Sequence, residues 1–313
     1  MYVVIPGGAG FIGSHLAIYL KERGYKVTCI DNLSRATKST IKTLEKEKIP
    51  LIITDIRETN KLLEIFKGAY VVIHAAALIS VEESIKDPLL YLDSNATGTA
   101  SVTKACIDAA VRRLIYLSSA AVYGEPIKLP IDEVHPTNPL SPYGLSKLFG
   151  EEIIKTFSRL YPFDYIILRL FNVYGAGQSE EYAGVITKFI NRVREKLPPI
   201  IFGDGEQTRD FIHVNDVCHA IELAITTKNT NNIYNIGSGT ATKIKDLAKL
   251  IMNIANINSE PIYSAPKPGD IKHSYANIDK ARELLNFISR ISLEKALKEF
   301  IQKSWIYRYM FFI

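Results

Sequence analysis

Cysteine is scarce in this 313-residue chain, and the three cysteines present, Cys29, Cys106 and Cys218, lie far apart. An odd number at wide spacing argues against a disulfide framework, and no two cysteines have the close spacing of a zinc site. The six histidines are dispersed as well, so no metal site is expected. We therefore expect a reduced, cytoplasmic protein, and no signal peptide, because the first predicted strand begins at residue 2.

The chain also lacks a strong charge of either sign, internal repeats and low-complexity linkers. Its 38 lysines and arginines exceed its 33 acidic residues only slightly, giving a scattered net charge of +5. This favours an ordinary solvated surface over a nucleic-acid partner, although a mild positive charge suits an anionic small substrate. Hydrophobic residues make up 47% of the chain, enough for the core of one large or two smaller domains in a compact unit.

No apolar run is long enough to span a membrane. The most apolar stretch closes the chain at residues 305–313, and Arg308 interrupts it. We expect this tail to dock on the protein's own surface or on a second subunit. A peripheral membrane contact is the alternative.

Short apolar runs alternate with helical segments in the first half of the chain. Strands are expected at residues 2–5, 26–30, 51–53, 70–73, 114–117 and 165–168, and a long helix at about 91–111. Continuous apolar strands between amphipathic helices are typical of a parallel sheet covered on both faces. The predicted fold class is α/β, with a doubly wound (Rossmann) parallel sheet.

Loops rich in glycine and polar residues become frequent from about Phe171 onward. We therefore predict a nucleotide-binding domain over residues 1–170. Residues 171–313 are predicted to form a smaller substrate-binding region, some segments of which return to the main sheet.

The first predicted strand runs directly into a glycine-rich loop that is followed by a helix. Gly7, Gly10 and Gly13 permit a tight turn and let the backbone approach a pyrophosphate at the helix N-terminus. The second strand ends in Asp31, eighteen residues after Gly13, where a carboxylate can accept both ribose hydroxyls of NAD and repel the extra phosphate of NADP. The pattern predicts NAD as the cofactor, while the nearby Arg35 leaves NADP open.

Tyr143 and Lys147 lie four residues apart in a segment with clear helix-start signals. Ser141 is a good N-cap, and Pro142 suits the first helical position. The two side chains should then share one helix face, where a phenol beside an ammonium can act as a base toward a sugar or alcohol hydroxyl. The same spacing recurs at residues 263 and 267, but a proline before that lysine argues against a helix there.

Polar and small residues follow two neighbouring strands of the predicted sheet. Ser119 ends the fifth strand, where its hydroxyl can hydrogen-bond a reacting hydroxyl and pass the proton along. Ala75 and Ala76 follow the fourth strand and leave room for a cofactor. Ligands of such sheets lie outside the carboxyl ends of the strands. Together with Tyr143 and Lys147, these residues predict a hydride-transfer site.

These motifs resemble the extended short-chain dehydrogenase/reductase family and, within it, the UDP-sugar 4-epimerases. The matching stretches span residues 1 to about 285: 7–14, 31–34, 55–57, 74–76, 95, 118–124, 143–147, 169–175, 203–213 and 268–270. The resemblance implies an isomerase that uses NAD to oxidise C4 of a UDP-hexose transiently to a 4-keto sugar. Hydride then returns to the other face of the sugar.

The resemblance also implies roles for individual residues. Tyr143 would be the base, Lys147 would lower its pKa and hold the nicotinamide ribose, and Ser119 would bridge to the sugar 4-hydroxyl. NAD would contact Gly7, Gly10, Phe11, Ile12, Gly13, Asp31, Asn32, Ser34, Asp55, Ile56, Ala75, Ala76, Asn95, Lys147 and Phe171. The UDP-sugar would contact Ser119, Tyr143, Asn172, Val185, Arg209, Lys267, Asp270 and Ser274.

Related enzymes share the serine or threonine, tyrosine and lysine but carry out other reactions. Sugar-nucleotide 4,6-dehydratases place Asp–Glu directly after their catalytic threonine, and UDP-glucuronate decarboxylases place a glutamate in the same segment. In this chain the corresponding positions, directly after Ser119, are Ala120 and Ala121, and neither side chain can donate or accept a proton. This favours epimerisation; a dehydratase or an NAD(P)H-dependent nucleotide-sugar reductase is the alternative.

Two further expectations come from the resemblance. Ser274 aligns with a position that is bulky in epimerases restricted to plain hexoses and small in those that accept N-acetyl groups. UDP-GlcNAc and UDP-GalNAc are therefore expected to fit as well as UDP-glucose and UDP-galactose. Family members often form homodimers through a four-helix bundle, to which the helices near 91–111 and 142–160 would contribute.

Overall fold

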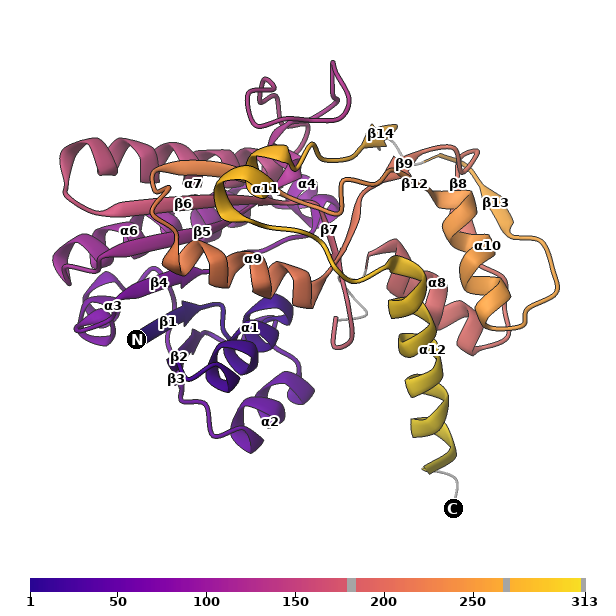
Figure 1. The fold of residues 1–313 in the computed structure, drawn as a ribbon, viewed down its shortest axis with the longest axis horizontal. Coiled ribbons are helices and arrows are strands. Elements are labelled where there is room, and N and C mark those ends of the chain that lie inside the picture. Colours follow the sequence, from indigo (N-terminus) through magenta and orange to yellow (C-terminus); the bar gives the residue numbers. More distant parts are fainter. Residues whose placement is uncertain (179–183, 267–270, 311–313) are drawn as a thin grey trace.

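A parallel sheet of seven strands forms the centre of the molecule (Figure 1). The computed structural model describes residues 1–178, 184–266 and 271–310, and side chains as far as Ile301. The strands follow the order β11-β6-β5-β4-β1-β2-β3. Their bounds are β1 Tyr2–Pro6, β2 Lys26–Asp31, β3 Leu51–Ile53, β4 Val71–His74, β5 Arg113–Ser119, β6 Asp164–Leu170 and β11 Asn232–Ile236. Every neighbouring pair is parallel, which confirms the predicted doubly wound α/β fold.

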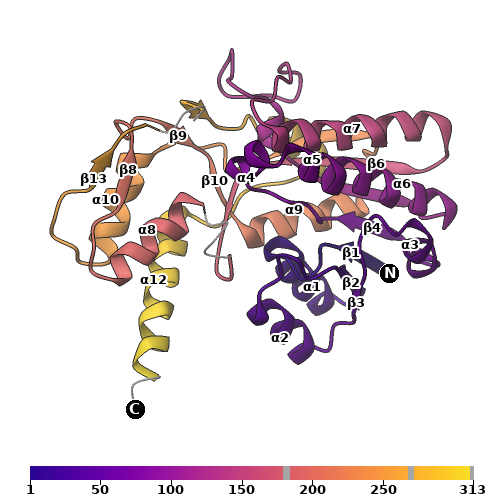
Figure 2. The same cartoon turned by 180° about the vertical axis from the view of Figure 1, so that it is seen from behind.

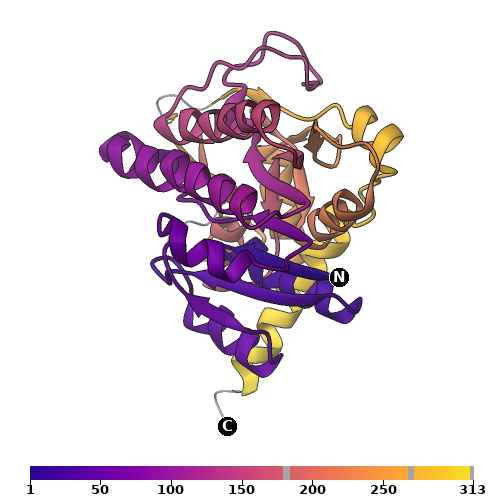
Figure 3. The same cartoon turned by 90° about the vertical axis from the view of Figure 1, so that its left-hand side faces the viewer.

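Helices cover both faces of this sheet, as Figure 3 shows from the side. One face packs on α1 (Phe11–Glu22), α2 (Lys38–Lys46), α9 (Val214–Thr226) and α11 (Asp279–Leu285), and the other on α3 (Thr59–Phe66), α6 (Gly98–Asp108) and α7 (Pro142–Leu160). Successive strand residues point to opposite faces, so Val3 and Ile5 enter the first core while Val4 enters the second. Burial on both faces explains why the strands are continuously apolar.

A second, smaller group of elements lies beside the sheet (Figure 2). Its strand pairs are β7 (Asn172–Tyr174) with β10 (Phe211–His213) and β8 (Ile200–Phe202) with β13 (Ile262–Ser264). A third group joins β12 (Thr242–Lys243), β9 (Thr208–Arg209) and β14 (His273–Ser274). The helices α8 (Val185–Arg194), α10 (Ile244–Ile254) and α12 (Leu293–Met310) enclose a separate apolar core here. β11 pairs with β6, so this later part of the chain also contributes to the main sheet.

The helix expected at about 91–111 is divided into pieces. After α4 (Val81–Lys86), the chain forms α5 (Pro88–Tyr91), a π-helical turn η1 (Leu92–Thr97) and then α6. Such π turns are rare and often occur at functional sites. A short 3₁₀ turn, η2 (Ala120–Val122), likewise follows β5 directly. Both irregular turns lie next to residues that the sequence assigns to the site.

The C-terminal helix α12 leads away from the sheet in Figures 1 and 2. The predicted docking of residues 305–313 falls on side chains outside the described part of the chain. Within the described residues, no helix is long and apolar enough to cross a membrane. The same residues contain no group of histidine, cysteine and carboxylate side chains that could hold a metal ion.

Candidate functional site

The glycine loop lies where the sheet order changes direction, between β1 and β4. Gly7 has a φ of +82°, and a Cβ there would lie 2.4 Å from the backbone nitrogen of Ala76. A Cβ on Gly13 would lie 2.1 Å from the carbonyl oxygen of Gly7. The loop is therefore closed against itself and against the segment after β4. Ligands of doubly wound sheets bind at such a switch point.

The N-terminus of α1 opens onto a cavity at this point. Gly10 is the N-cap residue, and no side chain caps the first N–H groups of the helix. A Cβ on Gly10 would meet only the Gly7 carbonyl oxygen, at 3.2 Å, and Gly10 itself lines the cavity. Free N–H groups with the positive end of the helix dipole suit a pyrophosphate. The residues present therefore fit a dinucleotide such as NAD.

Most of the residues predicted to contact NAD line this cavity. They are Gly7, Gly10, Asp31, Asn32, Ser34, Asp55, Ile56, Ala75, Ala76 and Asn95. The predicted contacts outside this lining are Phe11, Ile12, Gly13, Lys147 and Phe171. Sequence reasoning did not assign Arg57, Leu78 and Ser94, which also line it.

The carboxylate of Asp31, at the end of β2, is held by two backbone groups. It accepts hydrogen bonds from the N–H of Ala9 (3.1 Å) and of Leu33 (2.8 Å). Burial raises the pKa of Asp31, and these hydrogen bonds oppose that rise. The guanidinium of Arg35, also in the lining, contacts Glu83 at 2.5 Å. The negative charge of Glu83 offsets the positive charge of Arg35, which would otherwise favour the extra phosphate of NADP.

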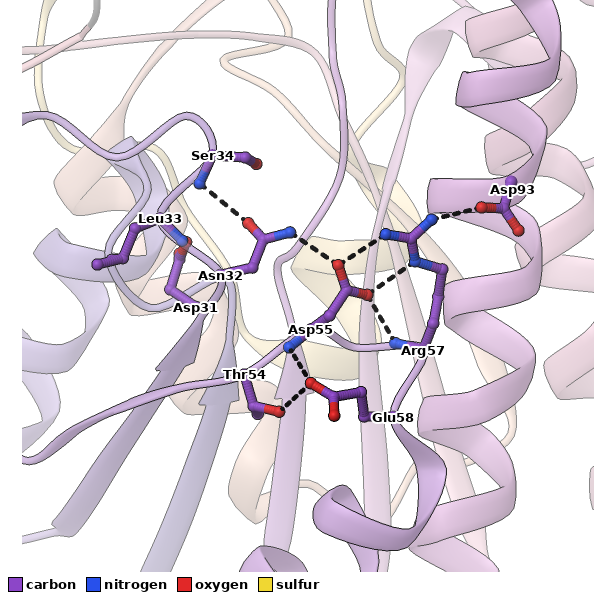
Figure 4. Close-up of polar contacts among 9 residues, drawn as sticks. All are labelled: Asp31, Asn32, Leu33, Ser34, Thr54, Asp55, Arg57, Glu58 and Asp93. Atoms are coloured by element: carbon purple, nitrogen blue, oxygen red, sulfur yellow. Dashed lines mark hydrogen bonds and ion pairs between the residues drawn. The ribbon is translucent and has the colours of Figure 1, made fainter.

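A polar cluster holds the loops around the other end of the cavity together (Figure 4). Asp55 accepts from the Arg57 side chain through both carboxylate oxygens, at 2.8 Å each, and from the Nδ2 of Asn32 at 2.9 Å. Arg57 also donates to Asp93 in η1. The hydrogen bonds from Arg57 hold the pKa of Asp55 well below its usual range. Arg57 thus connects the segments after β2 and β3 to the π turn.

Replacing Arg57 by alanine is expected to weaken NAD binding roughly tenfold, because the bidentate contact that orients Asp55 and the link to Asp93 are both lost. The dissociation constant can be measured calorimetrically on protein stripped of cofactor. Lys61→Ala is a matched control, because Lys61 pairs with Glu58 in the same segment but is largely exposed. Nicotinamide mononucleotide, which lacks the adenosine, should bind both variants equally. Unchanged NAD affinity in Arg57→Ala would contradict this role.

Tyr143 lies in the first turn of α7, at the carboxyl edge of β5. Ser141 caps the helix by accepting from the N–H of Gly144 at 3.1 Å, as the sequence predicts. The phenol of Tyr143 is hydrogen-bonded to Ser119, the last residue of β5. Its ring meets the ring of Tyr91 edge-on at 6.4 Å. The structure therefore brings the predicted serine and tyrosine into contact.

Lys147 follows one turn later and is 3% exposed. Its ammonium lies 4.2 Å from the ring centre of Tyr116. Burial lowers the pKa of Lys147 to about 7, and the charge of Glu151 opposes that drop.

Burial raises the pKa of Tyr143, and the hydrogen bond with Ser119 lowers it. The lowering of this pKa by Lys147 and oxidised nicotinamide together stays a prediction.

The π turn links the cofactor cavity to the catalytic helix, through contacts that sequence reasoning missed. Asn95 is buried and exchanges hydrogen bonds with the backbone of Leu78, at 2.8 and 2.9 Å. Its Nδ2 also donates to Ser146 at 2.9 Å, and Ser146 in turn donates to the carbonyl oxygen of Tyr143 at 2.8 Å. Asn95 thus positions the loop after β4 relative to Tyr143.

Three of the predicted UDP-sugar contacts, Asn172, Arg209 and Ser274, lie on the short strands beside the sheet. Ser274 is opposite Arg209 in the β14–β9 pairing. Asn172, in β7, donates through Nδ2 to the carbonyl oxygen of Asp210, the residue after Arg209, at 3.0 Å. Val185 begins α8. The predicted contacts at positions 267 and 270 lie outside the described residues.

Comparisons with known proteins agree with this geometry. The model of the NAD dependent epimerase/dehydratase family matches residues 3–237. A Methanocaldococcus jannaschii protein, provisionally named a UDP-glucose 4-epimerase, is 42% identical over 302 residues, covering 96% of this chain and 97% of the relative.

Two solved structures have the same fold. The UDP-glucose 4-epimerase of Thermotoga maritima with UDP-glucose superposes with a TM-score of 0.92 at 34% identity, covering 97% of this chain and 100% of that chain. The UDP-N-acetylglucosamine 4-epimerase of Methanobrevibacter ruminantium, in complex with UDP-N-acetylmuramic acid, also has a TM-score of 0.92, at 35% identity and 98% coverage of both chains. The chain therefore belongs to the NAD-dependent epimerase/dehydratase family, as an isomerase of the UDP-glucose 4-epimerase type.

Proposed function

We propose that this protein inverts the configuration at C4 of a UDP-hexose, and that UDP-glucose and UDP-galactose are among its substrates. The observation that carries the proposal is the hydrogen bond between Tyr143 and Ser119, followed by Ala120 and Ala121 in η2. This arrangement supplies a base for one hydroxyl and no further acid or base in that turn. The UDP-sugar 4-epimerases among its relatives support it.

In the proposed reaction, Tyr143 accepts the proton of the 4-hydroxyl, and Ser119 holds that hydroxyl through its own hydrogen bond. NAD, which Gly7, Gly10 and Asp31 would hold, would supply the acceptor and donor of the hydride exchanged with C4 of the sugar. Lys147 stabilises the tyrosinate by its positive charge. Tyr143 then returns the proton to the new hydroxyl, so the chain ends the cycle in its starting protonation state.

The alternatives require groups that this turn does not contain. Elimination of water needs an acid and a base beside the tyrosine, and Ala120 and Ala121 carry neither. A reductase would consume reduced cofactor in every turnover, whereas an epimerase regenerates NAD. A single experiment separates the three reactions: purified protein is incubated with UDP-galactose without added cofactor, and the products are identified by NMR. Formation of UDP-glucose supports the proposal, whereas accumulation of a keto sugar or an absolute need for NADPH overturns it.

We further propose that residues 171–313 form the substrate-binding region and that N-acetylated UDP-hexoses are accepted. The support is Ser274, a small and largely buried residue opposite Arg209 in the strand pairing. The proposed contacts of the uridine diphosphate are still Asn172, Val185, Arg209, Lys267 and Asp270. Arg209 suits a diphosphate because its fork can bond two oxygens, whereas Lys267 keeps only the charge.

UDP-GalNAc and UDP-galactose are therefore expected to turn over at comparable rates. Ser274→Tyr should lower kcat/KM for UDP-GalNAc at least tenfold while leaving UDP-galactose within about threefold, because a large ring fills the space of the acetyl group. Coupled assays with both substrates check this. Absence of turnover with UDP-GalNAc in the wild-type protein would contradict the prediction.

We also propose that the protein is a homodimer in the cytoplasm, where its three free, buried cysteines would stay reduced. The support comes from helices α4, α5 and α7, which are neighbours (Figure 2) and carry exposed apolar side chains. Ile85, Leu89 and Phe149 on these helices are 62%, 76% and 43% exposed. A second copy of the same helices would bury them, as in an isologous twofold interface.

Leu89→Glu is therefore expected to convert a dimer into a monomer, because a charged side chain opposes burial at this position. Light scattering coupled to gel filtration reads the mass directly. Ile288→Glu is the control, since Ile288 is similarly exposed, at 55%, but lies outside these helices. A monomeric wild-type protein would rule out the proposed dimer.

A further inference from the structure

A buried carboxylate lies one helical turn after Lys147. Glu151 is one helical turn after Lys147 on α7, so the two side chains share one face of the helix. Glu151 is completely buried and Lys147 is 3% exposed. Neither the sequence motifs nor the proposed mechanism uses Glu151.

Glu151 is held by groups from two strands of the sheet. Arg169 of β6 binds it with both arms of its guanidinium, Nε to Oε1 at 3.0 Å and Nη2 to Oε2 at 2.7 Å. Ser118 of β5 donates to Oε1 at 2.5 Å. Arg169 also lies over the ring of Tyr123, with its guanidinium carbon 4.7 Å from the ring centre. The carboxylate is thus fixed in place.

A buried ion pair of this kind is weak evidence for stability, because desolvation of the two charges offsets most of their attraction. Its position beside Lys147 indicates another purpose. Lys147 and Arg169 are two buried cations, and Glu151 lies in contact with one and one turn from the other. Without Glu151, these two positive charges would both stay buried in a medium that screens them poorly.

We propose that Glu151 is a positioning residue that keeps the ammonium of Lys147 protonated and in place for the reaction. The proposal rests on the proposed function only in so far as Lys147 must carry a charge for Tyr143 to act as a base.

Among the described residues, the other titratable groups that face Lys147 supply no negative charge. From β4, burial and the charge of Lys147 lower the pKa of His74 to about 3, so its ring is neutral. From β5, burial raises the pKa of Tyr116 well above 10, and from α7 itself the pKa of Tyr143 is raised too. Glu151 is the group whose charge raises the pKa of Lys147 against burial.

The sign of the effect follows. Burial favours the neutral amine of Lys147, and the Glu151 carboxylate favours the ammonium. Removing that carboxylate should therefore lower the pKa of Lys147 further below 7. A drop of one unit would reduce the protonated fraction at pH 7 from about half to about a tenth.

The pKa of Lys147 can be measured without any substrate. Protein labelled with ¹³C at lysine Cε is titrated by NMR, and the Lys147 signal is assigned by its loss in Lys147→Met. Glu151→Gln is expected to lower this pKa by at least one unit. Glu152→Gln, which alters the neighbouring exposed carboxylate paired with Lys155, should leave it unchanged. An unchanged Lys147 titration in Glu151→Gln overturns the proposal.

Glu151→Gln also leaves Arg169 buried without its partner and can fail to fold for that reason. The double variant Glu151→Gln/Arg169→Gln buries neither charge and serves the same test. Its Lys147 pKa is expected below that of the wild-type protein, because Glu151 is the charge that acts on Lys147. If the Lys147 pKa of the double variant equals that of the wild-type protein, the proposal is overturned.

A kinetic measurement separates this proposal from the proposed function. If the protein epimerises UDP-galactose, the alkaline limb of its kcat profile should move to lower pH in Glu151→Gln by the same amount as the NMR titration. A merely structural role would lower stability and leave that limb in place, which would overturn the proposal. If the wild-type protein shows no epimerase activity, the proposed function fails, while the NMR titration still decides the role of Glu151.

Discussion

Tyr143→Phe is expected to lower kcat for UDP-galactose by about a thousandfold, while NAD stays bound. The substitution removes the phenolic oxygen that contacts Ser119 and keeps the ring that packs edge-on against Tyr91. General acid–base groups typically contribute 10² to 10⁴ in rate, and no neighbouring group replaces this one, because Ala120 and Ala121 carry no proton. The fold should be unaffected, since phenylalanine fills nearly the same volume.

Steady-state kinetics and the NAD content of the purified protein test this expectation together. Tyr161→Phe is the matched control, because Tyr161 follows the end of the same helix and is 40% exposed. It should change neither kcat nor NAD content. If Tyr143→Phe keeps more than about a tenth of the wild-type kcat, Tyr143 is not the base.

Gly13→Ala is expected to prevent NAD binding and to destabilise the protein by roughly 3 kcal/mol, the upper end of the usual range for overpacking. The new Cβ would lie 2.1 Å from the carbonyl oxygen of Gly7 and 2.8 Å from the Cα of Gly8. Both are backbone atoms of the loop that approaches the pyrophosphate, so relief of the clash requires the loop to move. The N–H groups at the start of α1 would then lose their arrangement around a phosphate.

Chemical unfolding and calorimetric NAD binding measure the two effects. Gly184→Ala is a control for added volume, because a Cβ there has no atom of the described residues within 4 Å. Gly24→Ala is a control for backbone strain, since Gly24 has a φ of +82° but open space around it. Gly13→Ala should lower both the stability and the NAD affinity more than either control does. Normal NAD affinity in Gly13→Ala would show that the loop does not need this close packing.

Local sequence signals account for much of the fold. Every strand predicted in the first half of the chain forms, with bounds that differ by at most two residues at either end. Ser141 and Pro142 start α7 as predicted, because capping depends on neighbouring backbone groups alone. The π turn within the predicted helix at about 91–111 was not foreseen. Its Asn95 is held by Leu78 and by Ser146 of α7, which are distant in sequence.

Part of the site could also be predicted from neighbouring residues. Asp31 at the end of β2 and the glycine loop after β1 are local patterns, and the structure places both at one cavity. Glu151 was available as a signal too, since it continues the four-residue spacing of Tyr143 and Lys147. That spacing indicates a shared helix face, but it cannot show that Arg169 lies opposite.

The different partners of the adjacent serines Ser118 and Ser119 could not be predicted from the sequence. Ser118 and Ser119 end the same strand, and successive side chains of a strand point to opposite faces of the sheet. The sequence alone determined the α/β class, the cofactor loop and the pairing of Tyr143 with Lys147, because each depends on residues close together in the chain. The tertiary structure decided that Ser119 meets Tyr143 while Ser118 and Arg169 meet Glu151, and that Lys147 is buried. These contacts depend on how α7 packs across β5 and β6, and that packing sets the pKa values on which the reaction depends.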